Sequence, residues 1–324
     1  MKLQQGMPLH RTAEVVTVTL NPAVDETVFL EELRPGSVNR ATRLHRQAGG
    51  KGVNVSSMLG GYGIPNVATG FLGRENPRLF EELFSARGIR DEFLRIRGST
   101  RSGIKIVEQS AGRTTDINFD GLEPDAADLD TLMRKLGGLA GPGMWVVIGG
   151  RLPAGVSLGF FRDLLVMLKR TGAKIAADTS GEALSAAIEC GVDLIKPNQH
   201  ELEEVLGREL PDFAACAAAA LQLQRERIPR VILSLGQAGA LFLSPEAALR
   251  ARSPQVRVVS TVGAGDSLLA GYLAGLVTGR SAEECAGLAT VFAGCALEDV
   301  ARTPPTPELA EERMDLIEVR PLVA

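Results

Sequence analysis

A run of small residues followed by a carboxylate offers the most specific chemistry in the sequence. It reads Ser-Thr-Val-Gly-Ala-Gly-Asp and leads into an apolar pattern that predicts a helix beginning at Asp266. Backbone N–H groups of Gly263, Ala264 and Gly265 at such a helix start converge on an anion, and the helix dipole strengthens their attraction. Asp266 is placed there to accept a proton from an attacking hydroxyl. The alternative is an ordinary glycine turn with Asp266 as the helix N-cap.

A second cluster of glycines surrounds a lysine near the N-terminus. Gly49 and Gly50 expose backbone N–H groups, Lys51 supplies a positive charge, and Asn54 can bridge sugar hydroxyls through its amide. Upstream, Asp25 follows the first predicted strand, at the end of the sheet where ligands bind in open α/β folds. The alternatives are a tightly packed helix start with a solvated lysine, and a carboxylate that caps its own turn.

Neither glycine cluster is a familiar nucleotide motif. A P-loop needs Ser or Thr after its lysine and a further glycine upstream, and this chain has Gly52 and His45 at those places. The later turn lacks the third glycine of the dinucleotide fingerprint, because Leu268 stands there. An NAD-dependent oxidoreductase is therefore disfavoured.

Two more turns after predicted strands carry groups suited to a nucleotide and a metal. Asn198 and Glu201 share one face of a helix start that follows Lys196, and such oxygen ligands suit Mg²⁺. The alternative is a capping box, and both can hold at once. The other turn has glycines that let its backbone approach a flat or phosphate-bearing ligand, and it consists of Ser234, Leu235, Gly236, Gln237, Ala238 and Gly239.

Two cations precede a predicted hairpin. Arg101 and Lys105 are four apart in a strand and therefore share a face. The guanidinium suits bidentate binding of a phosphate, and the ammonium adds a point charge. A solvated surface is an equal alternative on these residues alone. The three histidines, which are His10, His45 and His200, are too scattered for a zinc site or a Ser–His pair.

The elements that must position these groups alternate between short β-branched runs and helical patterns. This alternation predicts a doubly wound α/β fold, with a mostly parallel sheet and helices on both faces. The predicted strands are Val15–Thr19, Asn66–Thr69, Met144–Gly149, Lys174–Asp178, Asp193–Lys196 and Val231–Leu235. The predicted helices are Val53–Tyr62, Pro77–Ala86, Asp125–Leu136, Leu158–Arg170, Glu182–Glu189 and Phe213–Gln224, and the chain after Ser260 is mostly helical.

Two stretches interrupt this alternation and resemble half-exposed antiparallel strands. We expect them to form a small β-sheet lid over the strand ends of the main domain. We therefore predict that the lid consists of residues 25–48 and 98–120. The main α/β domain is predicted to consist of residues 13–24, 49–97 and 121–324. Residues 1–12 are expected to be a flexible lead-in.

Composition excludes several classes of protein. The 35 basic and 39 acidic residues among 324 give a formal net charge of −4, which is not the footprint of a nucleic-acid-binding protein. No apolar run approaches the roughly 20 residues of a membrane span. The four cysteines form no C-x-x-C pair and are expected to be buried apolar residues. We expect a cytoplasmic enzyme without nucleic-acid or membrane partners.

Five such segments in this order resemble the ribokinase-like (PfkB) family of sugar kinases, from about Val15 to Ala301. Within the family the chain is most similar to bacterial 1-phosphofructokinases, with tagatose-6-phosphate kinase and the minor 6-phosphofructokinase as relatives. Seven motifs match that narrower group, and they are residues 19–25, 49–54, 70–73, 178–181, 196–198, 234–236 and 260–266.

The resemblance implies ATP-dependent phosphorylation of a sugar phosphate, with fructose 1-phosphate as the expected substrate, by a homodimer joined through its lids. It implies that Asp266 is the catalytic base, that residues 263–265 form the anion hole, and that Asn198 and Glu201 organise Mg²⁺. It places ATP at Lys196, Asn198, Gly265 and residues 234–239. It places the sugar at Asp25, Gly49, Gly50 and Asn54, and its phosphate at Lys51, Arg101 and Lys105.

Two departures bear on the identity of the sugar. Arg151 stands where the family has a phosphate-binding serine, and Gly103 replaces an asparagine near the substrate. Arg151 either binds the phosphate more strongly or redirects specificity, so tagatose 6-phosphate and fructose 6-phosphate stay open as substrates. A non-catalytic sugar-phosphate sensor is a more distant alternative, because such a protein would have lost the base or the anion-hole glycines, and both are present.

Overall fold

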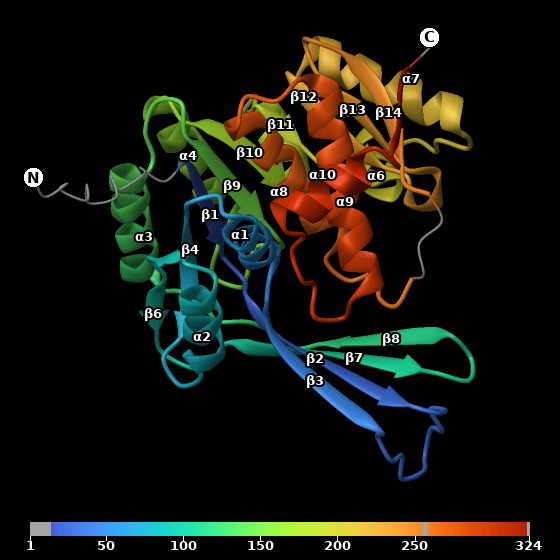
Figure 1. The fold of residues 1–324 in the computed structure, drawn as a ribbon. Coiled ribbons are helices and arrows are strands. Elements are labelled where there is room, and N and C mark those ends of the chain that lie inside the picture. Colours follow the sequence, from blue (N-terminus) through green and yellow to red (C-terminus); the bar gives the residue numbers. More distant parts are fainter. Residues whose placement is uncertain (1–13, 255–257, 323–324) are drawn as a thin grey trace, which may run out of the picture.

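The short β-branched runs form the centre of one large sheet (Figure 1). The computed structural model describes residues 14–254 and 258–322. It contains an 11-stranded sheet and a separate 4-stranded sheet. In order across the large sheet the strands are Glu318–Pro321 (β15), Ala248–Arg252 (β14), Ala240–Leu243 (β13), Arg230–Ser234 (β12), Leu194–Ile195 (β11), Lys174–Asp178 (β10), Trp145–Gly149 (β9), Val15–Thr19 (β1), Asn66–Gly73 (β4) and Arg90–Asp91 (β5), with Leu94–Ile96 (β6) beside β4.

The large sheet is parallel from β5 to β12 and antiparallel at its other edge. The predicted bounds of β1 and β10 are confirmed, and β4 continues four residues beyond its predicted end, to Gly73. Strands β13, β14 and β15 pair antiparallel with one another and with β12, and the sequence patterns did not predict them.

Helices cover both faces of this sheet (Figure 1). On one face lie Ala126–Leu139 (α3), Leu158–Arg170 (α4), Gly181–Glu189 (α5), Gln199–Leu206 (α6) and Phe213–Glu226 (α7). On the other lie Lys51–Tyr62 (α1), Ala264–Val277 (α8), Ala282–Glu298 (α9) and Pro307–Met314 (α10). The helix Arg78–Ala86 (α2) packs into a smaller cluster with β4 through Phe80 and Phe84.

Alternate side chains of the central strands reach the two hydrophobic cores. In β1, Val16 and Val18 belong to the core under α3–α7, whereas Val15 belongs to the core under α1 and α8–α10. Strand β9 divides in the same way, with Val146 on the first side and Val147 on the second. Because both faces of a doubly covered sheet are apolar, its strands are continuous hydrophobic runs, and this explains why they were the clearest elements in the sequence.

The two irregular stretches form the small sheet as predicted. It consists of Arg43–Gly49 (β3), Ala23–Leu30 (β2), Arg101–Glu108 (β7) and Arg113–Asn118 (β8), in that order. Figure 1 shows it extending from the end of the large sheet at which β1 enters β2. Strand β8 is exposed along its whole length, so the small sheet has little core of its own.

The remaining expectations concern the termini, the cysteines and membranes. The predicted flexible lead-in, residues 1–12, lies outside the described residues. Cys216, Cys285 and Cys295 are buried, Cys190 is half-buried, and none of them is in a disulfide. Within residues 14–254 and 258–322, no helix combines the length and apolar character needed to span a bilayer.

Candidate active site

The carboxyl ends of the central strands meet in one row, and the predicted site residues gather above it. Thr19, the last residue of β1, is in register with Gly70 of β4 and Gly149 of β9, and Gly149 is in register with Asp178 of β10. The glycines keep this row open: a Cβ on Gly70 would lie 2.0 Å from the Thr19 carbonyl oxygen. The topology therefore delivers groups from distant parts of the chain to a single edge.

The start of α8 has the geometry of an anion site with a carboxylate beside it. Gly263 is the N-cap with φ 76°, which favours glycine, and Ala264 and Gly265 are the first helical residues. Asp266 lies in the first turn and is 8% exposed. Its Oδ2 accepts a 2.6 Å hydrogen bond from Asn54 Nδ2 of α1, so the two glycine clusters of the sequence meet here. Gly263 and not Asp266 is the N-cap, and no side-chain capping bond is present.

Two lysines of the site converge on Asp178. Lys51 Nζ lies 2.7 Å and Lys196 Nζ 3.3 Å from Asp178 Oδ1, and the carboxylate is fully buried. Lys196 also approaches the anion site, because a Cβ on Gly265 would lie 3.2 Å from its Nζ. Asp178 had no predicted role, although its position as the last residue of the buried strand β10 is a signal for a site residue. Asp25, which was predicted to follow a strand's carboxyl end, lies instead within β2 of the small sheet, because the chain re-enters a strand at Ala23.

Burial and neighbouring charges shift the pKa values of these groups in different directions. Burial raises the pKa of Asp266 above its ordinary value, and the Asp178 carboxylate raises it further, against the influence of Lys51, Asn54 and Lys196. Burial alone would also raise the pKa of Asp178, but Lys196 and Lys51 outweigh it and lower that pKa. For Lys51, burial acts to lower the pKa, yet Asp178 and Asp266 hold it above the usual range. Asp178 is therefore the firmly ionised carboxylate of the site, and Asp266 is the more basic one.

Asp25 is held by an arginine that the sequence analysis missed. Its Oδ2 accepts a 3.2 Å hydrogen bond from Arg302 Nη2, and the Arg302 side chain is 7% exposed. A Cβ on Gly49 would lie 2.2 Å from the same Oδ2, so only glycine leaves room for this carboxylate. Gly50, the N-cap of α1, has φ 113°. Arg302 follows α9 in an irregular segment with φ 53°, where the sequence offers no local signal of its role.

The predicted phosphate-binding cations do not all gather at one point. Arg101, at the start of β7, donates through Nε to Asn21 Oδ1 at 3.0 Å. Burial lowers its pKa, the Asp25 carboxylate acts to raise it, and the positive charge of the exposed Arg151 acts to lower it. Lys105 shares a face of β7 with Arg101 but pairs with Asp116 of β8. Its role in binding phosphate remains a prediction.

The two remaining turns have structural roles of their own. Asn198 and Glu201 form the capping box of α6, with both reciprocal hydrogen bonds at 2.9 Å. Residues 236–238 form a 3₁₀ turn after β12, and Ser234 is bridged to Asn198. Gly239, with φ 90°, must be glycine, because a Cβ would lie 2.2 Å from the Ala251 carbonyl oxygen. Neither role excludes the predicted metal or nucleotide contacts, and neither tests them.

Comparison with known proteins identifies the family. The model of the "pfkB family carbohydrate kinase" matches residues 18–309. The chain belongs to the pfkB family of carbohydrate kinases. Its fold is the one expected of that family, since phosphofructokinase-2 from Escherichia coli, solved in complex with substrates and products, superposes with a TM-score of 0.88 at 26% identity, over 93% of this chain and 98% of that one.

Curated members of the pfkB family are still more similar in sequence. The 1-phosphofructokinase of Xanthomonas campestris is 42% identical over 91% of this chain and 94% of its own length. The 1-phosphofructokinase of Escherichia coli is 40% identical over 87% of this chain and 90% of its own length. This pfkB kinase therefore resembles those enzymes over almost the whole of both chains, and not in an isolated motif.

The donors available for a metal in this pfkB kinase are few. No group of three or more His, Cys, Asp or Glu side chains within the described residues is arranged to enclose an ion. The Asn198–Glu201 pair offers an amide and a carboxylate, and the charge of Glu201 is felt by Lys51. Mg²⁺ is usually bound by one or two carboxylates with retained waters and substrate phosphates, so this sparse set fits it.

Proposed function

We propose that this kinase transfers the γ-phosphoryl group of ATP to the 6-hydroxyl of fructose 1-phosphate, giving fructose 1,6-bisphosphate and ADP. The observation that carries the proposal is the buried Asp266, bound by Asn54 and seated beside the glycine N-terminus of α8. The curated relatives named above, which are 1-phosphofructokinases, support this choice of substrate.

Asp266 acts as the base in this mechanism. It removes the proton of the attacking hydroxyl while an O–P bond forms to the γ-phosphorus and the bond to the β–γ bridging oxygen breaks, releasing ADP. A positioned base contributes roughly 10²–10⁴-fold to the rate. Its raised pKa makes it a stronger proton acceptor than a free carboxylate, and Asn54 holds it in place.

Backbone donors and lysines stabilise the charge that develops during transfer. The N–H groups of residues 263–265 receive the oxygens of the transferring phosphoryl group, and each such donor contributes about 3–4 kcal/mol in comparable sites. Lys196 stands beside Gly265 and carries positive charge toward the same point. The residues of the 3₁₀ turn at 234–239 line the nucleotide site.

The sugar phosphate lies between the small sheet and the large one. Asp25, Asn54 and the backbone of Gly49 and Gly50 hold its hydroxyls. Its phosphate is received by Lys51, Arg101 and Arg151, and by Lys105 if that lysine exchanges Asp116 for the phosphate. A phosphate bound by both Arg101 and Arg151 would offset the like charge of the two arginines.

Asn198 and Glu201 would organise Mg²⁺, which supplies charge neutralisation on the triphosphate when bound. The capping box engages one oxygen of Glu201, Oε2, and thereby fixes the orientation of the carboxylate. The small sheet, residues 25–48 and 98–120, serves as a lid that excludes water from the transfer.

A homodimer joined through the lids completes the proposal. Its support is the exposed apolar surface of the two outer strands of the small sheet, where Leu44 is 49% exposed and Ile117 43%. Edge strands of this kind need a partner or a cover. A related phosphofructokinase-2 from Escherichia coli was solved as a "tetrameric inhibited form" (TM-score 0.85, 26% identity, 94% of this chain and 98% of that one). The enzyme is expected in the cytoplasm.

The test compares kcat/KM for fructose 1-phosphate, fructose 6-phosphate and tagatose 6-phosphate, with ADP release as the readout. We expect the first to be preferred. Preference for either 6-phosphate would reassign the substrate, and absence of ADP release with all three would favour a sensor. Asp266→Asn should lower kcat by about 10²–10⁴-fold with modest change in KM. Near-normal turnover in that variant would refute the assignment of the base.

A further inference from the structure

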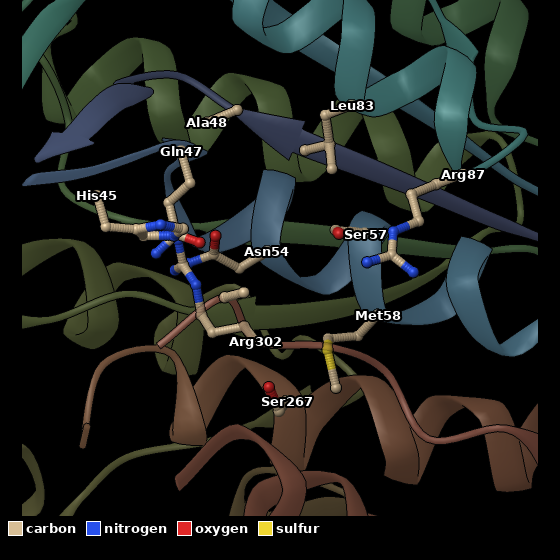
Figure 2. Close-up of a pocket in the computed structure, with 11 residues that line it drawn as sticks. His45, Gln47, Ala48, Asn54, Ser57, Met58, Leu83, Arg87, Ser267 and Arg302 are labelled. Atoms are coloured by element: carbon tan, nitrogen blue, oxygen red, sulfur yellow. The ribbon is translucent and has the colours of Figure 1, made fainter. Parts of the chain in front are cut away.

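A pocket with two arginines in a largely apolar wall adjoins the predicted sugar site and shares Asn54 with it. Its cavity volume is about 140 Å³, and it opens between β3, α1, the end of α2 and the segment that follows α9. Figure 2 shows the Arg87 guanidinium on one side and Arg302, His45 and Gln47 on the other. None of Lys51, Arg101 and Arg151, the cations assigned to the sugar's phosphate, lines it.

The two charged side chains of this pocket that are always ionised, Arg87 and Arg302, are both cationic, and Arg302 is paired with Asp25 just outside the lining. Arg87 and Arg302 contribute guanidinium groups, and no Asp or Glu side chain is among the lining residues. The other polar side chains are those of His45, Gln47, Asn54, Ser57 and Ser267, and the rest of the wall is apolar. A surface with this lining repels cations and attracts anions, and guanidinium groups match the geometry of phosphate oxygens.

Three buried polar atoms of the pocket have no hydrogen-bond partner within the described part of the chain: Arg302 Nη1, Ser267 Oγ and His45 Nε2. Arg302 is 6% exposed and Ser267 1% exposed, so the surrounding protein shields both from bulk water. Buried donors are rarely left unmatched, because their desolvation is then uncompensated. These atoms have almost no accessible surface toward the cavity, so an acceptor-rich ligand would reach them only after their side chains shift slightly.

We infer that this pocket is a second anion-binding site, which takes inorganic phosphate or the phosphate of a phosphomonoester. Arg302 connects it to the sugar site, because the same guanidinium donates through Nη2 to Asp25. Asn54 lines the pocket as well and donates to Asp266. An anion bound here therefore touches the two residues that hold the sugar-binding carboxylate and the base.

The site is tested by calorimetric titration of the full-length enzyme, without sugar or nucleotide, with inorganic phosphate and separately with methyl phosphate. Arg87→Gln should weaken one binding event by about tenfold or more, as expected for loss of a charged hydrogen bond. Arg78→Gln is the matched control, since it removes an equal charge from an exposed position of α2 and should titrate like the wild type. Binding of both probes indicates a phosphomonoester site, and binding of phosphate alone indicates a site for the free ion.

Arg101→Gln separates this site from that of the substrate. Arg101→Gln should weaken the binding of phosphate at the sugar-phosphate site and not at the pocket. The double variant, Arg87→Gln with Arg101→Gln, should lose binding at both sites. Arg87→Lys, which keeps the charge, should retain part of the affinity and guards against a folding defect in Arg87→Gln. The inference is overturned if Arg87→Gln titrates like Arg78→Gln, because the pocket then holds only water. Since no turnover is measured, this outcome is independent of the proposed kinase activity.

Discussion

Replacing Asp178 by asparagine removes the charge that holds two lysines at the active site. Asp178 is fully buried, with Lys51 Nζ at 2.7 Å and Lys196 Nζ at 3.3 Å from Oδ1. Asparagine has the same shape but no charge, so both ammonium groups would lose their anion. Their mutual repulsion would then also be uncompensated.

The expected loss of stability follows from the exposure of the two lysines. Breaking a buried ion pair costs about 3–5 kcal/mol, because the charge left behind is not compensated. The Lys51 side chain is 32% exposed, so water screens part of its interaction, whereas Lys196 is only 6% exposed. We therefore expect Asp178→Asn to lower the free energy of unfolding by about 3 kcal/mol, at the lower end of that range, with most of the loss arising at Lys196.

Urea unfolding followed by circular dichroism measures this loss. Asp163→Asn, on the exposed surface of α4, is the control and should change stability by less than about 0.5 kcal/mol. A loss in Asp178→Asn of under about 1 kcal/mol, the range of surface ion pairs, would refute the reasoning.

The dependence on pH gives an independent check. The pKa of Asp178 is lowered in the folded protein and that of Lys51 is raised, from ordinary values of 3.8 and 10.5. The pair is therefore fully stabilising between those two values. Its contribution is lost as pH falls through the lowered pKa of Asp178 or rises through the raised pKa of Lys51. The difference in stability between the wild type and Asp178→Asn should accordingly be constant near neutral pH.

Three further predictions concern catalysis and binding. Asp266 must be ionised to act as a base and its pKa is raised, so in pH–rate profiles kcat should begin to fall, as the pH is lowered, at a higher pH than an ordinary carboxylate would give. Asn54→Ala removes a hydrogen bond to the ionised form of Asp266 and should move this fall in kcat to still higher pH. Arg101→Ala should raise the KM for the sugar phosphate about 10–100-fold and leave that for ATP nearly unchanged, which initial-rate kinetics will decide. Gly263→Ala should impair both folding and turnover, because residue 263 has φ 76° and the new Cβ would lie 2.6 Å from Arg302 Cδ. A melting temperature and a turnover rate equal to those of the wild type would contradict this.

The sequence predicted most reliably what local pattern determines. Strands β1 and β10 and helix α4 have the predicted bounds, since continuous apolar runs and helical spacing are properties of neighbouring residues. The antiparallel edge, β13 to β15, was missed because β14 is interrupted by arginines and β15 is mostly exposed, so neither is a continuous apolar run. Such strands exist because β12 offers them an edge, and no local signal reports that.

The residues of the site also differ in whether local sequence or the fold determines their role. The glycine turns and Asp266 were found because their chemistry depends on adjacent residues. The pairing of Lys105 with Asp116 depends on the register of β7 against β8, which spacing within one strand cannot give. Arg302 reaches Asp25 across 277 positions of the chain, so its role appears only once the fold is formed.

The contacts between the small sheet and the segment after α9 also bear on motion. Gln47 Nε2 of β3 donates to the Val300 carbonyl at 3.2 Å, next to the ion pair between Asp25 and Arg302. Together these bonds form a latch across the mouth of the site. Any movement of the small sheet away from this segment would have to break both bonds and separate the ion pair, in which Arg302 is 7% and Asp25 27% exposed.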